Sequence, residues 1–247
     1  MKPTFYDYIK NLVKTEKINI LDDKITVRDH VASITILPKL YYHGSIKDCN
    51  FNDLPNSYVI KPTDQCNSRG VEFIQNNQNT NKNQIVQKYL KQNIHKVMIE
   101  EMLYENKQRV LTDYKFFIFN GEIKIISVIK NISTPQHKIY DFDIDWNRVR
   151  VHVIHGVEKR HSLQKPDNLE EMKAIAIRLG KFYHEFTSIP FVRVDLFDTD
   201  NGIIFGEYTQ TPNAGENLTQ EYQIKFGNYW TKSLHDIQSA TPPNKKD

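Results

Sequence analysis

The stretch FVRVDLFDTDNGIIFGEYTQTP, residues 191–212, decides how the rest of the chain is interpreted. Two runs rich in β-branched and aromatic residues flank Asp-Asn-Gly at 200–202, a pattern that predicts a β-hairpin. The length of the loop decides the register. A two-residue Asn-Gly turn would place Glu207 among apolar side chains. A three-residue loop, with Gly202 in the left-handed conformation, instead pairs Asp195 with Glu207.

The same loop places Arg193 opposite Thr209, on the face that carries the two carboxylates. Directly opposed residues lie roughly 5 Å apart at Cβ, and carboxylates this close repel each other unless a cation or a shared proton compensates. Hard divalent ions prefer oxygen ligands. The hairpin therefore predicts a Mg²⁺ site with Asp195 and Glu207 as ligands. The alternative interpretation is a solvated acidic hairpin with Arg193 as its counter-ion.

The composition excludes several classes of protein. At 247 residues the chain can bury a full core, as one domain or as two small lobes. Lys and Arg number 33 against 30 Asp and Glu, and no basic run is long enough to indicate nucleic-acid binding. The sequence has neither a long apolar run nor a signal-peptide core, so we expect a cytoplasmic protein without membrane insertion. Cys49 and Cys66 match no metal-binding spacing, and we expect no disulfide between them.

Helical and strand patterns alternate without a strict βαβ rhythm, and several hairpins are antiparallel, which predicts an α+β fold. Apolar spacing and capping residues predict helices within residues 1–20, 22–31, 85–92, 168–186 and 222–237. Strands are predicted within 34–47, 57–62, 71–76, 95–103, 113–119 and 122–130, with 57–62 and 71–76 as antiparallel partners. Residues 131–165 are predicted to be an irregular lid or substrate region.

The hairpin DYKFFIF-NG-EIKIISVIK, residues 113–130, contains an Asn-Gly pair typical of a type I′ turn. That turn predicts that Phe117 pairs with Lys124 and that Lys115 pairs with Ile126. Lys115 then points away from the apolar face, toward solvent or a site.

Two further stretches contain groups suited to nucleotide chemistry. In VIKPTDQCNSRGV, residues 59–71, Lys61 ends a buried strand and a polar loop runs on to Gly70. Such a loop can turn N–H groups toward phosphate while the lysine adds a point charge, although the Walker A spacing is absent. The alternative is a mobile polar hairpin tip with an exposed lysine. The strand VMIEEML adds Glu100 and Glu101, which point to opposite faces.

Taken in order, these stretches resemble the ATP-grasp superfamily and, within it, the TupA-like group associated with teichuronopeptide and surface-polysaccharide synthesis. LPNSYVIKPTDQCNSRGV is similar to its lysine and phosphate loop, and VMIEEML to its adenine-binding hinge. DYKFFIFNGEIKIISV is similar to the stretch with its second basic residue, and FVRVDLF with IFGEYTQTP to its metal-binding hairpin. The resemblance covers residues 23–215 approximately. It implies two lobes whose largely antiparallel sheets sandwich ATP.

The resemblance implies a division of the chain and a role for each matching residue. The expected parts are an N-terminal segment packed on the core (1–55), a small lobe (56–103), a large lobe (104–240) and a disordered tail (241–247). Residues implied in ATP binding would contact the phosphates or the adenine: Lys61, Asn67, Ser68, Arg69, Gly70, Glu100, Glu101, Leu103 and Lys115.

Asp195, Glu207 and Thr209 would form the Mg²⁺ site. Many members of the superfamily have Asn where this chain has Thr209, so the resemblance leaves open whether one metal ion or two are bound. Arg193 and Lys115 would be the catalytic residues, with Arg193 stabilising the transferred phosphoryl group or the tetrahedral intermediate.

The implied activity is that of an ATP- and Mg²⁺-dependent carboxylate–amine ligase, which forms an amide through an acyl phosphate in polysaccharide or peptide-conjugate synthesis. Its substrates would be a small-molecule or glycan carboxylate and an amine. Two alternatives stay open: a kinase that phosphorylates a sugar or another small acceptor, and a nucleotide- or sugar-binding module without turnover. No Ser/His/Asp or Cys/His arrangement in the sequence indicates a nucleophilic side chain.

Overall fold

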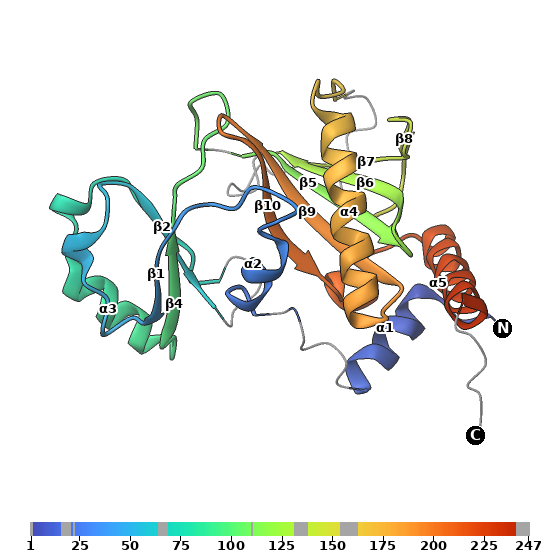
Figure 1. The fold of residues 1–247 in the computed structure, drawn as a ribbon, viewed down its shortest axis with the longest axis horizontal. Coiled ribbons are helices and arrows are strands. Elements are labelled where there is room, and N and C mark those ends of the chain that lie inside the picture. Colours follow the sequence, from blue (N-terminus) through green and yellow to red (C-terminus); the bar gives the residue numbers. More distant parts are fainter. Residues whose placement is uncertain are drawn as a thin grey trace.

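The computed structural model describes residues 2–15, 21, 23–63, 69–109, 111–130, 138–153 and 163–240. These residues form a smaller and a larger lobe, each built on an antiparallel sheet backed by helices (Figure 1). This arrangement confirms the predicted α+β class. No helix in these ranges is both long enough and apolar enough to cross a membrane.

The smaller lobe contains a sheet in the order β1-β4-β2-β3, with one helix packed on it. Its elements are β1 (Leu40–Ser45), β2 (Tyr58–Pro62), β3 (Glu72–Ile74), α3 (Lys82–Lys91) and β4 (Lys96–Glu100). Strand β3 pairs antiparallel with β2, as predicted. Helix α3 begins earlier than predicted because the Asn81 side chain accepts a hydrogen bond from the Gln84 N–H and caps it. Ile85 and Tyr89 of α3 then pack into the core under the sheet.

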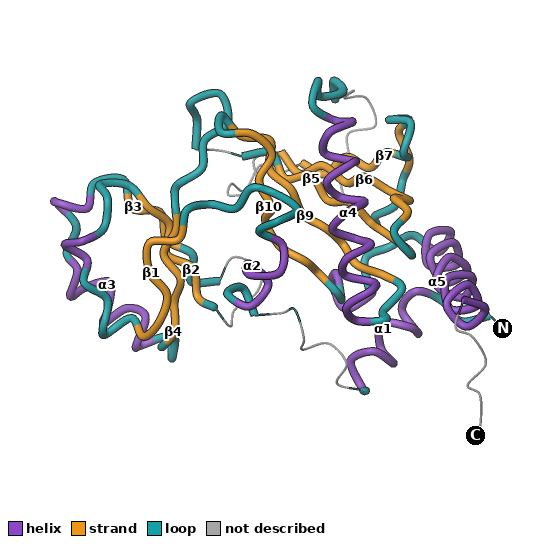
Figure 2. The backbone as a smooth tube through the Cα atoms, viewed as in Figure 1, coloured by secondary structure: helices purple, strands orange, loops and turns teal. Residues whose placement is uncertain are grey.

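The larger lobe contains a sheet in the order β10-β9-β5-β6-β7-β8, with helices on both faces (Figure 2). Its strands are β5 (Asp113–Phe119), β6 (Glu122–Lys130), β7 (Lys138–Phe142), β8 (Arg148–Val149), β9 (Phe191–Thr199) and β10 (Gly202–Thr209). Its helices are α1 (Phe5–Lys14), α2 (Thr26–Val31), α4 (Leu169–Thr187) and α5 (Gln220–Ala240). Helix α4 packs closely on one face, where the space at Gly180 is filled by Ile118.

Because side chains alternate along a strand, Asp113, Lys115 and Phe119 of β5 all lie on one face of the sheet. Along that face, one end of the strand is apolar and the other end is charged. Phe119 lies in an aromatic core with Phe5 of α1 and Phe226 of α5, at centroid distances of 6.2 and 5.3 Å. Lys115 and Asp113 occupy the same face of the strand but lie beyond the end of that aromatic core. The alternation that anchors β5 to the helices thus also presents two charged side chains at one end of the sheet.

The hairpin of β5 and β6 has the predicted turn but not the predicted register. Asn120 and Gly121 both have positive φ, as a type I′ turn requires. A bulge next to Ile118 then shifts the pairing, so that Phe117 faces Ile125 and Lys115 faces Ser127. The predicted pairs of Phe117 with Lys124 and Lys115 with Ile126 are therefore wrong. Lys124 is the extra residue at this bulge, and it bonds Glu122 at the surface. Because both faces of the sheet are covered, its neighbours Ile123, Ile125 and Ile126 are all buried.

Part of the region predicted to be irregular extends the large sheet. Strands β7 and β8 continue it beyond β6, and Phe142 stacks on Trp146 with their ring centroids 4.0 Å apart. The prediction missed these strands because they are short and rich in polar residues. Residues 131–137 and 154–162 of the predicted lid, and the predicted tail 241–247, lie outside the described residues. The division of the chain at residues 55 and 103 stays a prediction, although β1 pairs with β4 in the small sheet.

Candidate functional site

The hairpin of β9 and β10 has the predicted pairing for a different reason. Asp195 faces Glu207 and Arg193 faces Thr209, but the turn closes at Thr199 and Gly202. The register instead shifts by one residue at a bulge on Gly206. A Cβ atom at Gly206 would lie 2.8 Å from the Phe197 ring and 3.1 Å from the Asp195 carbonyl oxygen. The bulge, not the loop length, therefore brings the two carboxylates to one face.

Asp195 is the centre of a buried charge cluster. Its side chain is 2% exposed, and the Lys115 Nζ lies 2.5 Å from its Oδ2. The Arg193 guanidinium donates to both carboxylate oxygens, from Nε and from Nη2, at 2.6 Å each. Burial by itself would raise the pKa of Asp195, but Arg193 and Lys115 together hold that pKa below its usual value. Asp195 is thus ionised and fully paired with cations.

Asp113 is a second buried carboxylate in this cluster, and the sequence analysis did not assign it to the site. Its Oδ2 lies 2.6 Å from the Lys115 Nζ, while its buried Oδ1 has no hydrogen-bond partner among the described residues. Burial outweighs the attraction of Lys115 and raises the pKa of Asp113 to about 6. The signal that could have found it is the period of two along β5, which places Asp113 on the same face as Lys115.

Glu207 and Thr209 form the exposed side of the cluster. The Glu207 side chain is 50% exposed, and its Oε1 lies 3.6 Å from the Arg193 Nη2. The Thr209 hydroxyl accepts a hydrogen bond from Arg193 at 2.7 Å and donates one to Glu207 at 3.2 Å. The hydroxyl therefore links the exposed carboxylate to the buried part of the cluster.

The donor set of this cluster fits Mg²⁺ that arrives with a polyphosphate. The cluster combines three carboxylates with two cationic side chains, so it carries one net negative charge when all are ionised. The groups that it offers to a metal ion are all oxygen atoms. Mg²⁺ is usually held by one or two carboxylates together with substrate phosphates. A metal without phosphate ligands fits less well, because the cations already occupy both oxygens of Asp195. Consistently, the described residues include no group of three or more His, Cys, Asp or Glu placed to hold a metal ion.

In the small lobe, the predicted residues Lys61 and Glu100 contact each other. Glu100 is 2% exposed at the end of β4, and its two oxygens contact Lys61 of β2 and Arg28 of α2, the latter at 3.1 Å. Arg28 was not among the predicted site residues. Arg28 precedes Glu100 by 72 positions, and in the sequence it resembles any charged surface residue of a helix. No local pattern could therefore have identified it.

The other predicted nucleotide residues lie around the hinge and the loop after β2. The Glu101 N–H donates to the Lys39 carbonyl at 2.9 Å, and the Leu103 backbone has no hydrogen bond to a described group. Gly70 has a φ of 72° and its carbonyl accepts from the Tyr89 hydroxyl at 2.6 Å. Arg69 is exposed beside it. Asn67 and Ser68 lie outside the described residues, so their predicted role remains a prediction.

The tip of the β9–β10 hairpin contacts the hinge. The Asp200 carboxylate accepts hydrogen bonds from the N–H groups of Asn106 and Lys107 at 2.7 and 2.8 Å, and the Asn201 amide donates to Glu101 at 3.3 Å. These contacts hold the hairpin that carries the charge cluster against the segment that follows β4. The fold thus places the predicted metal residues and the predicted hinge residues on connected elements.

A polar row continues from the charge cluster across the large sheet. Lys115 faces Ser127, and Ser127 faces Asp141 on β7. Asp141 accepts a hydrogen bond from the Ser127 hydroxyl at 2.6 Å, and its Oδ1 lies 2.9 Å from the His152 Nδ1. Burial opposes the ionised form, yet the hydrogen bonds from His152 and Ser127 hold the pKa of Asp141 below its usual value. Ser127, Asp141 and His152 were not predicted to form part of a site.

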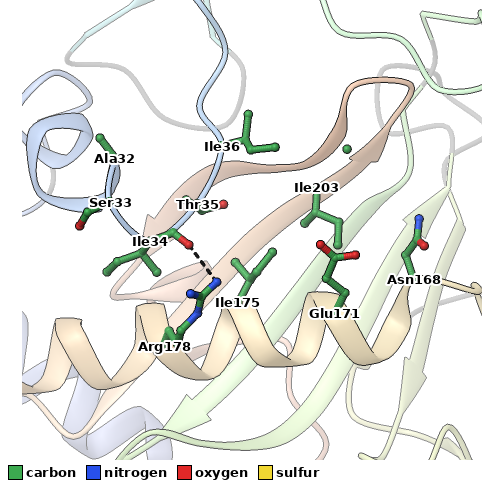
Figure 3. A pocket seen from close by; sticks show the side chains of 11 residues that line it. Ala32, Ser33, Ile34, Thr35, Ile36, Asn168, Glu171, Ile175, Arg178 and Ile203 are labelled. Atoms are coloured by element: carbon green, nitrogen blue, oxygen red, sulfur yellow. Dashed lines mark hydrogen bonds between the residues drawn. The ribbon is translucent and has the colours of Figure 1, made fainter.

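A hollow of about 380 Å³ lies elsewhere, between residues 32–36, helix α4 and the start of β10. Figure 3 shows Glu171 and Arg178 of α4 on one side and Thr35 on the other. None of the predicted site residues lines it. The hollow therefore does not compete with the charge cluster as the candidate site.

Comparisons with known proteins agree with the fold described above. Among solved structures, the chain is similar to D-cycloserine synthetase DcsG, with a TM-score of 0.56 and 13% identity over 94% of this chain and 78% of that one. It is also similar to D-alanine–D-alanine ligase from Bacillus anthracis complexed with ATP (TM-score 0.57, 15% identity, 95% and 76% covered). The corresponding ligase from Helicobacter pylori gives a TM-score of 0.53 at 12% identity, with 96% and 68% covered.

At these identities the likeness shows the fold alone. No curated protein sequence matches the chain significantly. The family model described as TupA-like ATPgrasp matches residues 8–231, which is most of the sequence. The chain therefore belongs to the TupA-like ATP-grasp family.

Proposed function

We propose that this protein is an ATP- and Mg²⁺-dependent ligase that joins a carboxylate to an amine through an acyl phosphate. The observation that carries the proposal is the buried cluster in which Lys115 and Arg193 converge on Asp195, directly opposite Glu207. Family membership supports it, and so do fold neighbours named as D-alanine–D-alanine ligase and D-cycloserine synthetase.

In this proposal the nucleotide lies between the two sheets. Lys61 and Lys115 bind the phosphates, Arg69 and Gly70 belong to the loop that covers them, and the hinge at Glu100–Glu101–Leu103 binds the adenine. Asp195, Glu207 and Thr209 hold Mg²⁺, which would compensate phosphate charge during transfer. Fixed positive charge at the transferred group is the main source of catalysis in phosphoryl transfer.

The reaction then needs no nucleophilic side chain. An oxygen of the substrate carboxylate attacks the γ-phosphorus, and the bond to the bridging oxygen breaks so that ADP leaves with the electron pair. The amine next attacks the carbonyl carbon of the acyl phosphate, inorganic phosphate leaves, and the nitrogen loses a proton. Arg193 lies beside Asp195, where it can stabilise charge on the transferred group. We further propose that the substrates come from polysaccharide or peptide-conjugate synthesis, as the resemblance implies.

The test is incubation with ATP, Mg²⁺ and a panel of uronic acids and amino acids, followed by assay of ADP and mass spectrometry of products. An amide product that requires both a carboxylate and an amine supports the ligase. A phosphorylated acceptor formed without an amine would identify the kinase alternative instead. Nucleotide binding without any ADP would identify a binding module. The Glu207→Gln variant is the control, since it removes a carboxylate proposed to bind Mg²⁺ from a half-exposed position, where the fold does not depend on that charge.

A further inference from the structure

Helix α2 belongs to the large lobe by packing but contacts the small lobe through its basic residues. Val27 and Val31 are buried in the core of the large lobe. Next to these valines on the helix, Arg28 contacts Glu100 of β4, and Lys24, just before the helix, donates to the Pro62 carbonyl of β2 at 3.2 Å. Figure 1 shows α2 between the two sheets. The helix thus places a fixed cation at the hinge.

The Glu100 carboxylate is shared by two cations that differ in how firmly they are held. Arg28 is 14% exposed and also donates to the Pro38 carbonyl, so its guanidinium is fixed from two sides. Lys61 is 28% exposed, and Glu100 is the one hydrogen-bond and ion-pair partner of its side chain among the described residues. Of the two, Lys61 is therefore the cation that can leave.

In the proposed function, Lys61 binds the nucleotide phosphates, and we take it to move away from Glu100 when it does so. If Lys61 turns to the phosphates of a bound nucleotide, Glu100 loses one of its two partners. A buried carboxylate without a cation is strongly unfavourable. Arg28 removes this problem, because it keeps one oxygen of Glu100 paired and in place at the hinge.

We propose that Arg28 is a positioning residue of the nucleotide site, which holds Glu100 neutralised and oriented and thereby releases Lys61 for the phosphates. The proposal rests on the proposed function, since it assigns Lys61 to a nucleotide. It predicts that Arg28 acts on nucleotide affinity only through Glu100.

The experiment is isothermal titration calorimetry of the full chain with Mg²⁺ and AMPPNP, a non-hydrolysable ATP analogue. Arg28→Gln should weaken binding at least tenfold, because Lys61 then remains on Glu100. Arg28→Lys keeps a cation beside Glu100 and should recover most of the affinity. The matched control is Arg178→Gln: Arg178 donates to the Ile34 carbonyl at 3.0 Å, in the same connecting segment as Pro38 (Figure 3). It should bind AMPPNP as the wild type does.

The decisive comparison uses the Glu100→Gln background. With no carboxylate to neutralise, adding Arg28→Gln should change the affinity less than twofold. An equal loss in both backgrounds, an equal loss in Arg178→Gln, or unchanged affinity in Arg28→Gln would each overturn the inference. If Arg28→Gln does not fold, Glu100→Gln must restore folding in the double variant, and an unfolded double variant would also overturn it.

The calorimetry also distinguishes an error in the proposed function from an error in the role of Arg28. A wild-type chain that does not bind Mg²⁺ and AMPPNP contradicts the nucleotide site itself, before any variant is compared. A wild-type chain that binds, together with an Arg28→Gln variant that binds equally well, contradicts only the role of Arg28.

Discussion

The two carboxylates proposed to bind Mg²⁺ should differ sharply in their effect on the stability of the metal-free protein. Asp195 is 2% exposed and neutralises both Lys115 and Arg193. Asp195→Asn keeps the side-chain shape but removes the negative charge that both cations neutralise. Breaking a buried ion pair in this way lowers the free energy of unfolding by about 3–5 kcal/mol. Glu207 is half-exposed, with Arg193 3.6 Å away. Exposed pairs contribute roughly 0.2–1 kcal/mol, so Glu207→Gln should change the free energy of unfolding by no more than this.

Urea unfolding of the metal-free protein at neutral pH measures both effects, provided that the m-values of the variants agree. We expect a lower midpoint for Asp195→Asn and a nearly unchanged one for Glu207→Gln, while both variants lose ADP formation with Mg²⁺ present. Repulsion between the two carboxylates, which the sequence alone suggests, would instead make Glu207→Gln more stable than the wild type. A clear stabilisation by Glu207→Gln, or equal small effects of both variants, would refute the reasoning from the counter-ions.

Three further predictions concern Asp113, the bulge and the phosphate loop. Because burial raises the pKa of Asp113 from 3.8 to about 6, its carboxyl binds a proton more tightly in the folded state. The wild type should therefore lose on the order of 3 kcal/mol of unfolding free energy relative to Asp113→Asn between pH 4 and 7; denaturation at several pH values that gave a constant difference would contradict this. Gly206→Ala places a Cβ 2.8 Å from the Phe197 ring and should destabilise the fold by about 1–3 kcal/mol, and an unchanged melting temperature would show that the bulge tolerates a side chain. Lys61→Ala should weaken Mg²⁺–ATP binding about tenfold to a hundredfold, since charge-assisted contacts are worth about 1.5–3 kcal/mol; unchanged affinity in calorimetry would mean that the lysine does not reach the phosphates.

The sequence by itself determined the local features of the fold. Period-two alternation and turn residues predicted the hairpins at residues 113–130 and 191–212, and the structure contains both. The spacing of Arg193 and Asp195 along one strand places them on one face whatever the partner strand does. The same alternation places Asp113 on the face that carries Lys115, so this part of the charge cluster could have been predicted from the sequence.

Only the tertiary structure decided the details that depend on packing between distant segments. The bulges at Gly206 and beside Ile118 set the registers of both hairpins, and a Cβ atom at Gly206 would meet the Phe197 ring of the neighbouring strand. The pairing of Arg28 with Glu100 joins residues 72 positions apart. A sequence pattern records neither a packing volume nor a distance across the fold, so it could identify Glu100 as a candidate but not the cation that neutralises it.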